Sequence, residues 1–331
     1  MLDKDAARRT DKLRPFSPSK LKRMLAIETI SPKSIVFRRT ARLIGSQFEI
    51  SVVGDSPSWA DDCFEAAISE ISRVEKLLSA FGDDSCINQI NGNAGVQPVK
   101  VDAEIFRLID RSLQISALTH GAFDITYCTA ATDHDETSSI LVRTAIKANY
   151  ENVVIDAKAQ TVFLKEANMR ISFAANGKGY AADRAKYTLQ LAGVNSGVIN
   201  AGGDLLTWGL QPDDEPWTIG AADPSQENQP FADVAISNMA VATSVNAENN
   251  ATVINKKLLG TCAPKKGFPV SKTKSVSIIS TTAELADAMA TPVLSIGINA
   301  GLYLINQLNQ IAAVIIDDHD RVYTSKNISI N

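Results

Sequence analysis

The spacing of hydrophobic residues along the chain changes period several times, and each period predicts a different element. Apolar residues alternate at Phe48, Ile50 and Val52, as in a strand, and then recur at helical spacing from Trp59 to Leu78. The segment Gly54 to Pro57 lies between the two patterns and is typical of a turn. The first part of the domain is therefore predicted to be a strand, a turn and an amphipathic helix.

Helical and strand-like patterns continue through the rest of the chain. One long helix is predicted at about 103–118, a second ends near Leu191, and a hairpin is predicted to join 153–155 to 161–164. Shorter helices are predicted at 21–27, 140–148 and 302–308. Further strands are predicted at 169–173, 217–221, 234–236, 239–243, 274–279, 312–316 and 322–325.

One of the helical segments carries candidate chemistry. Thr281 is followed three positions later by Glu284, which predicts a helix start with a reciprocal cap and places Asp287 early in that helix. Asp287 and Thr291 are four residues apart, so their side chains lie on one face, and their oxygens suit Mg²⁺. An ordinary helix explains the same spacing, with Thr291 bonding back to its own backbone and Asp287 favouring the helix dipole.

Three glycine-containing turns are further candidates, and each also has an ordinary structural explanation. The loop 174–179 precedes a predicted helix and presents Lys178 and backbone N–H groups in a manner that suits anionic oxygens. The segment 202–204 is predicted to be a hairpin turn between two strands. The segment 121–126, after His120, is typical of a helix end but also lets a flat ring approach the backbone.

Composition excludes some classes of function. The net charge of -4 gives no global reason to bind nucleic acid, and no run of about 18 apolar residues predicts a membrane span. The four cysteines have no paired spacing, which argues against a zinc site and a disulfide framework. No secretory signal is evident near Met1, so a cytoplasmic location is expected.

Five motifs in order resemble those of the FAD:protein FMN transferase family, called ApbE-like. The resemblance runs from about Arg42 to Ser325. The motifs are Ser79-Ala80-Phe81 through Asp84-Ser85 to Asn91, Gly121-Ala122-Phe123-Asp124-Ile125-Thr126, Lys178-Gly179-Tyr180-Ala181-Ala182-Asp183, Asn200-Ala201-Gly202-Gly203-Asp204, and Ala286-Asp287-Ala288-Met289-Ala290-Thr291.

The resemblance implies a fold and a chemistry. It implies an α+β, T-fold-like architecture with mixed or antiparallel sheets, packed helices and two entwined subdomains that hold FAD between them, over 41–331, after a polar extension at 1–40. It further implies that Mg²⁺ grips the FAD pyrophosphate, that a Thr or Ser hydroxyl of a target flavoprotein attacks the FMN phosphorus, and that AMP leaves. The implied metal ligands are Asp287, Thr291 and the carbonyl of Ala175. The implied FAD-binding residues are Phe81, Asp84, Asn91, Ala122, Asp124, Lys178, Gly202, Gly203 and Asp204.

The chain departs from the family pattern where a catalytic base is expected. Gly260 stands at the position of the family histidine and Ala263 at that of the following aspartate, so no catalytic residue is assigned. A missing base costs about a hundredfold to ten-thousandfold in rate. A non-catalytic FAD-binding protein and an FAD pyrophosphatase that yields FMN and AMP are therefore the alternatives to a transferase. Family members are usually exported, so a periplasmic location is the alternative to a cytoplasmic one.

Overall fold

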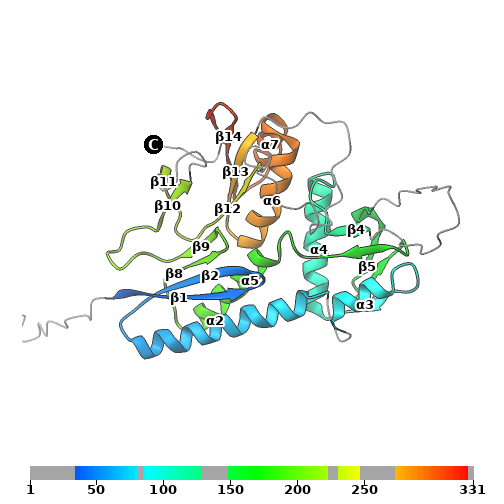
Figure 1. Ribbon diagram of the computed structural model, residues 1–331, viewed down its shortest axis with the longest axis horizontal. Coiled ribbons are helices and arrows are strands. Elements are labelled where there is room, and N and C mark those ends of the chain that lie inside the picture. The colour runs from blue at the N-terminus through cyan, green and yellow to red at the C-terminus, as the bar shows by residue number, and fades with distance from the viewer. Residues whose placement is uncertain are drawn as a thin grey trace, which may run out of the picture.

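The structure, a computed structural model, describes residues 34–80, 82, 85–128, 148–222, 230–246 and 273–326. Within these ranges the chain forms one large antiparallel sheet, a smaller subdomain of short strands and helices, and six α-helices (Figure 1). None of the helices in these ranges has both the length and the apolar character needed to cross a bilayer.

The large sheet contains eight strands in the order β1-β2-β8-β9-β12-β13-β14-β15, and every neighbouring pair is antiparallel. Consecutive strands are joined by short hairpins at β1–β2, β8–β9 and β14–β15. The strands are β1 Ile35–Leu43, β2 Ser46–Gly54, β8 Gly197–Ala201, β9 Asp204–Trp208, β12 Ala240–Val245, β13 Thr273–Ser280, β14 Ile311–Asp317 and β15 Val322–Thr324. A separate hairpin is formed by β10 Thr218–Ala222 and β11 Pro230–Ala235.

Four helices cover one face of this sheet. Side chains of a strand alternate between its two faces, and the inward set of each central strand joins a single core with the buried residues of the helices. A second, small cluster of described residues forms around Ile279, Ala312 and Val314. The helices are α2 Pro57–Leu78, α5 Gly177–Leu191, α6 Ala283–Ile296 and α7 Ile298–Ile305.

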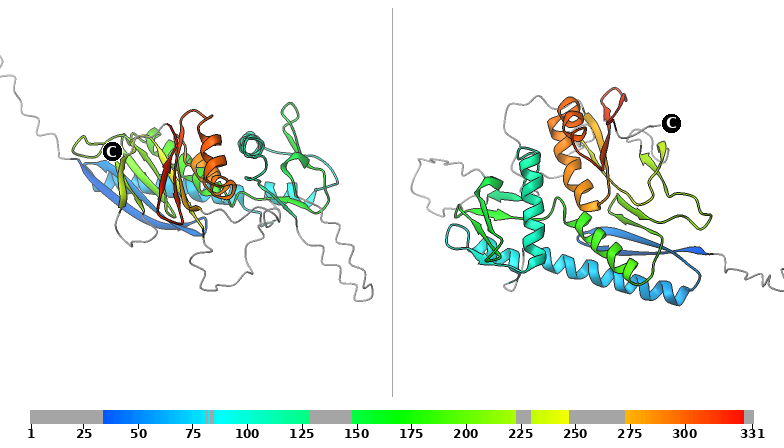
Figure 2. Two further views of the ribbon diagram at one scale, coloured as in Figure 1. Left: turned by 90° about the horizontal axis from the view of Figure 1, so that it is seen from above. Right: turned by 180° about the vertical axis from the view of Figure 1, so that it is seen from behind.

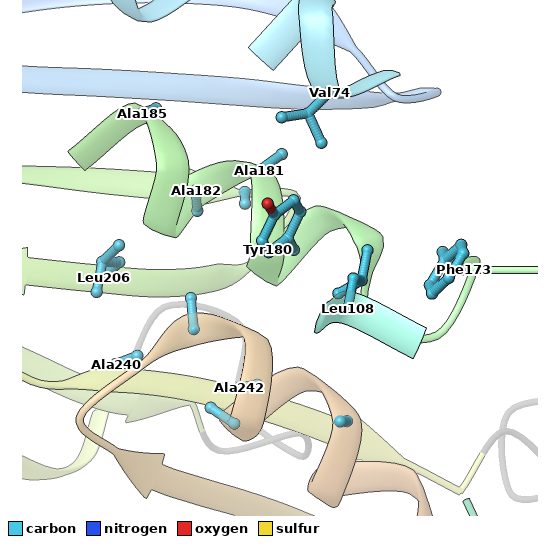
Figure 3. Packing of buried hydrophobic residues seen from close by; sticks show 14 of the residues in the cluster. Val74, Leu108, Phe173, Tyr180, Ala181, Ala182, Ala185, Leu206, Ala240 and Ala242 are labelled. Carbon is cyan, nitrogen blue, oxygen red and sulfur yellow. The ribbon is translucent and has the colours of Figure 1, made fainter. Parts of the chain in front are cut away.

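Helix α5 lies at the centre of this layer. Figure 3 shows Ala181, Ala182 and Ala185 of α5 between Val74 of α2 and Leu206 of the sheet, and all five are buried. Alanine side chains let neighbouring elements approach closely, so α5 contacts both α2 and α6. The start of α5 is thereby held next to the first turns of α6.

The smaller subdomain is inserted between α2 and α5. The chain leaves the large sheet along α2 and returns to it through α5, which is what entwines the two parts (Figures 1 and 2). The elements of this subdomain are α3 Cys86–Gly92, β3 Val99–Lys100, α4 Ala103–Leu118, β4 Thr126–Cys128, the 3₁₀ turn Tyr150–Asn152, β5 Val153–Asp156, β6 Thr161–Leu164 and β7 Met169–Ile171. The strands pair as β3-β6-β5 and β4-β7.

Most predicted elements are confirmed, but several boundaries differ, and β11 begins at Pro230 rather than at 234. The predicted reciprocal cap of α6 is wrong: Thr282 is the N-cap, and Glu284 instead forms a bidentate ion pair with Arg111. Helix α7 begins at Ile298 rather than at 302, and β1 begins at Ile35, inside the predicted extension 1–40. The predicted helix at 21–27, and all but the last residue of that at 140–148, lie outside the described residues.

Candidate functional site

The candidate site lies where the start of α5 meets the first turns of α6. Asp287 is half-buried on α6, and its Oδ2 accepts a hydrogen bond from the backbone N–H of Gly179 on α5 at 3.2 Å. A Cβ atom at Gly179 would overlap the backbone carbonyl of Ala283, so only glycine allows this approach of the two helices. The start of α5, which carries Lys178, is thus in direct contact with the part of α6 that carries the predicted metal ligand Asp287, although the two are more than 100 residues apart in sequence.

A second carboxylate reaches the same place from the sheet. Lys178 Nζ lies 3.8 Å from Asp204 Oδ2, and both side chains are largely covered. The predicted hairpin turn at 202–204 is confirmed as a two-residue turn: Asp204 begins β9 directly after Gly202 and Gly203, both of which have the positive φ that such a turn requires. The side chain of Asn200 stabilises this turn by accepting the N–H of Gly203 at 2.8 Å.

The electrostatics of the site favour a cation. Burial and the nearby negative charge of Asp204 raise the pKa of Asp287 to about 7, against the opposing effects of Lys178 and of the N–H of Gly179. Burial also raises the pKa of Asp204, and Lys178 and the N–H of Thr243 oppose that rise. Two carboxyl groups therefore share one lysine, and a further positive charge would favour the ionised form of both.

Thr291 lies one turn beyond Asp287, on the exposed part of α6. Its Oγ1 lies 2.9 Å from the Oγ of Ser244 on β12, so the two hydroxyls share a hydrogen bond. Thr291 therefore does not rely on its own helix for a partner. Sequence reasoning gave Ser244 no role, because nothing in the local pattern shows that β12 runs beside α6.

The donor set fits a hard cation such as Mg²⁺. Asp287 offers a carboxylate and Thr291 a hydroxyl, and Ala175 lies exposed in the turn before α5, where its carbonyl is the third predicted ligand. The part of the chain that the structure describes contains no group of three or more His, Cys, Asp or Glu side chains placed to bind a metal. Mg²⁺ at this site would thus depend on water and substrate oxygens to complete its shell, as Mg²⁺ commonly does.

Three further predicted FAD contacts, Asn91, Ala122 and Asp124, lie in the smaller subdomain. Asp124 accepts the N–H groups of Thr126 and Tyr150 at 2.8 and 3.0 Å, its pKa is raised by burial, and Ala122 is exposed on the same turn. Asn91 is buried, and its amide makes two hydrogen bonds with the backbone of Ile171 on β7.

These contacts give Asp124 and Asn91 clear structural roles, while their roles toward FAD stay predictions. Phe81, Asp84, Gly260 and Ala263 lie outside the described residues.

A cavity of about 430 Å³ lies between α4 and α5, and none of the predicted site residues lines it. It is lined by Glu104, Arg107, Arg111, Tyr180 and Arg184. Arg111 pairs with Glu284, Arg184 pairs with Glu70, and Arg73 connects Glu70 to Glu104. Because these ion pairs connect α2, α4, α5 and α6, the cavity wall holds the helices together beside the candidate site.

Comparisons with a family model and with known proteins point to the same family. The sequence model described as the ApbE family matches residues 44–315. The chain is 27% identical over 292 residues to an FAD:protein FMN transferase of Klebsiella pneumoniae (strain 342), covering 85% of this chain and 89% of that protein. It is 26% identical to the FAD:protein FMN transferase of Treponema pallidum (strain Nichols), with 88% and 87% covered.

Solved structures share the fold. The ApbE protein of Thermotoga maritima superposes with a TM-score of 0.70 at 24% identity, covering 88% of this chain and 97% of that one. The flavin transferase ApbE of Vibrio cholerae gives a TM-score of 0.72 at 20% identity, with 88% and 98% covered. A histidine-to-glycine mutant of the Vibrio cholerae protein gives a TM-score of 0.70.

Proposed function

This chain belongs to the ApbE family, and from that starting point we propose that it is a Mg²⁺-dependent FAD:protein FMN transferase. In this reaction a Thr or Ser hydroxyl oxygen of a target flavoprotein bonds to the FMN phosphorus of FAD. The bond from that phosphorus to the bridging oxygen breaks, AMP leaves with this oxygen, and the hydroxyl proton passes to a base or to solvent. The product carries FMN through a phosphoester.

The observation that carries the proposal is the convergence of Asp287, Asp204 and Lys178 at the junction of α5 and α6. The raised pKa of Asp287 reflects a buried carboxyl that lacks sufficient positive charge around it. A divalent cation held by Asp287 and Thr291 would supply that charge and would also neutralise a bound diphosphate. Phosphoryl transfer needs mainly positioning and charge neutralisation, which such an ion would provide.

Each residue of the site has a defined task in this proposal. Asp287, Thr291 and the carbonyl of Ala175 would hold Mg²⁺, which neutralises negative charge that develops on the diphosphate. Lys178 supplies an ammonium group, and the carboxylate of Asp204, 3.8 Å away, favours its charged form. Helix α5 starts at Gly177 with no hydrogen bond from the side chain of its own N-cap, Asn176, and the positive end of a helix dipole suits anionic oxygens.

Activity on FAD tests the proposal directly. The purified chain is incubated with FAD and Mg²⁺, with and without candidate acceptor flavoproteins, and AMP and covalently bound flavin are quantified by mass spectrometry and in-gel fluorescence. We expect both products in equal amounts with an acceptor, and loss of both in Asp287→Ala. Absence of AMP and of labelled protein across all acceptors would overturn the proposal.

The altered sequence motif provides a second variant. Gly260 occupies the position where the family pattern has histidine. If a general base is what this motif lacks, Gly260→His raises the transfer rate by about a hundredfold or more. An unchanged rate in a folded Gly260→His variant assigns proton removal to solvent or to the acceptor protein.

Gly260 and Ala263 also favour a second candidate function, an FAD-binding protein without turnover. FAD that stays intact for hours with Mg²⁺ and an acceptor would support this candidate. Release of AMP with free FMN, and no labelled protein, would instead identify an FAD pyrophosphatase.

A further inference from the structure

Helices α5 and α6 are joined by reciprocal hydrogen bonds, in which a carboxylate of each helix accepts backbone N–H groups of the other. Asp183 of α5 accepts the backbone N–H groups of Ala283 and Glu284, both at 2.9 Å, in the first turn of α6. Asp287 of α6 accepts the N–H of Gly179 in the first turn of α5. Each helix thus caps the start of the other with a carboxylate.

The spacing in sequence explains why both contacts form on one shared face. Asp183 follows Gly179 by four residues on α5, and Asp287 follows Ala283 by four residues on α6. Residues four apart lie on the same side of a helix, so each helix offers an N–H group and, one turn later, a carboxylate. The missing side chain of Gly179 brings the two backbones into direct contact at this point.

The start of α6 depends on Asp183 more than on its own residues. The side chain of Thr282, the N-cap of α6, accepts the N–H of Leu285 at 3.4 Å, a longer bond than either of those to Asp183. The side chain of Glu284 turns away to Arg111. Asp183 therefore satisfies two of the first N–H groups of α6, which have no partner within their own helix.

We infer that Asp183 is a positioning residue for the metal-binding helix. By fixing the first turn of α6 on α5, it sets the place of Asp287 relative to Gly179 and Lys178, and so the geometry in which Mg²⁺ and the diphosphate are held. This inference rests on the proposed function for its ligand, and on the hydrogen bonds alone for the coupling of the two helices.

A matched pair of variants tests this role. Asp183→Asn keeps the shape of the side chain but places an amide NH₂ against one of the two N–H donors. Asp102→Asn is the control, because Asp102 likewise accepts two N–H groups, of Glu104 and Ile105 at 2.8 Å, but at the start of α4. Asp102 accepts both N–H groups on Oδ1, which asparagine keeps, whereas Asp183 accepts one N–H on each oxygen. Asp102→Asn therefore controls for the loss of a charge at a helix start, and only Asp183→Asn is expected to lower the melting temperature.

Only Asp183→Asn is expected to change the response to Mg²⁺. FAD binding is followed by flavin fluorescence as Mg²⁺ is titrated. We expect the half-saturating Mg²⁺ concentration to rise by about tenfold in Asp183→Asn, as is typical when a residue that orients a metal ligand is changed. Asp102→Asn is expected to match the wild type. The same half-saturating concentration in both variants would overturn the inference.

Hydrogen exchange separates this test from that of the proposed function. Without FAD or Mg²⁺, Asp183→Asn is expected to accelerate exchange in residues 283–290 and 177–182, and Asp102→Asn is not. Unchanged exchange in these segments overturns the inference even if the protein is a transferase, whereas a wild type that binds no FAD with Mg²⁺ overturns the proposed function alone. If Asp183→Asn does not fold, Asp183→Glu, which keeps the charge and moves it by one methylene group, takes its place.

Discussion

Replacing Gly179 by alanine tests the contact on which the candidate site depends. The added methyl group would overlap the carbonyl of Ala283 and crowd the N–H of Glu284, and both belong to the backbone of α6. Backbone atoms cannot move aside as the end of a flexible side chain can. The two helices must therefore separate, and the hydrogen bond from Gly179 to Asp287 must lengthen.

The size of the effect follows from two opposing contributions. Overpacking in a closely packed contact costs about 1–3 kcal/mol, and alanine is favoured over glycine within a helix by up to about 1 kcal/mol. The expected net loss of stability is about 1 kcal/mol, the middle of the range that the two contributions leave. For a chain of this size the melting temperature is expected to fall by roughly 2–4 °C.

The assay compares Gly179→Ala with Gly92→Ala. A Cβ atom at Gly92, the last residue of α3, meets no other atom within 4 Å, so this control adds the same methyl group without a clash. We expect Gly179→Ala to lower the melting temperature and to weaken Mg²⁺-dependent FAD binding by about tenfold, as expected when a metal ligand is misplaced. If both variants keep the stability and FAD affinity of the wild type, α5 and α6 do not meet as described.

Three further variants probe single residues of the site. A carboxyl with a pKa of about 7 is mostly protonated at pH 6, so the half-saturating Mg²⁺ concentration is expected to be about tenfold higher at pH 6 than at pH 8. Because this folded-state pKa lies above that of an unfolded aspartate, the proton also stabilises the metal-free protein at low pH, and that contribution is lost as the pH rises through about 7. Asp287→Asn is expected to reduce both dependences, and their full persistence would assign them to other groups. Lys178→Met removes a charge that lowers the pKa of Asp204 and Asp287, so both pKa values are expected to rise further. FAD affinity at saturating Mg²⁺ is expected to fall in Lys178→Met but not in Lys158→Met, a change at an exposed hairpin turn, and equal affinities would contradict a phosphate-binding role for Lys178. Asn91→Ala leaves the N–H and carbonyl of Ile171 buried without their partner and is expected to lower the free energy of unfolding by about 2–3 kcal/mol. Unchanged stability with weakened FAD binding would instead place Asn91 in the pocket.

Local structure was largely determined by the sequence itself. The helix from 103 to 118 and the hairpin at 153–164 follow from hydrophobic period and turn residues, which act over a few positions. The pairing of Asp287 and Thr291 on one helical face follows from the same geometry. The order of the five motifs was sufficient to indicate the family, which the match over residues 44–315 confirms.

Contacts between distant elements were decided only by the tertiary structure. Glu284 has the spacing of a local cap, yet it pairs with Arg111, 173 positions away, because α4 lies beside the start of α6. Asp183 was part of a motif, yet its role became visible only when α5 and α6 were seen in contact. Such hydrogen bonds form between groups that burial brings together, and the hydrophobic period of a segment records which face is buried but not what lies against it.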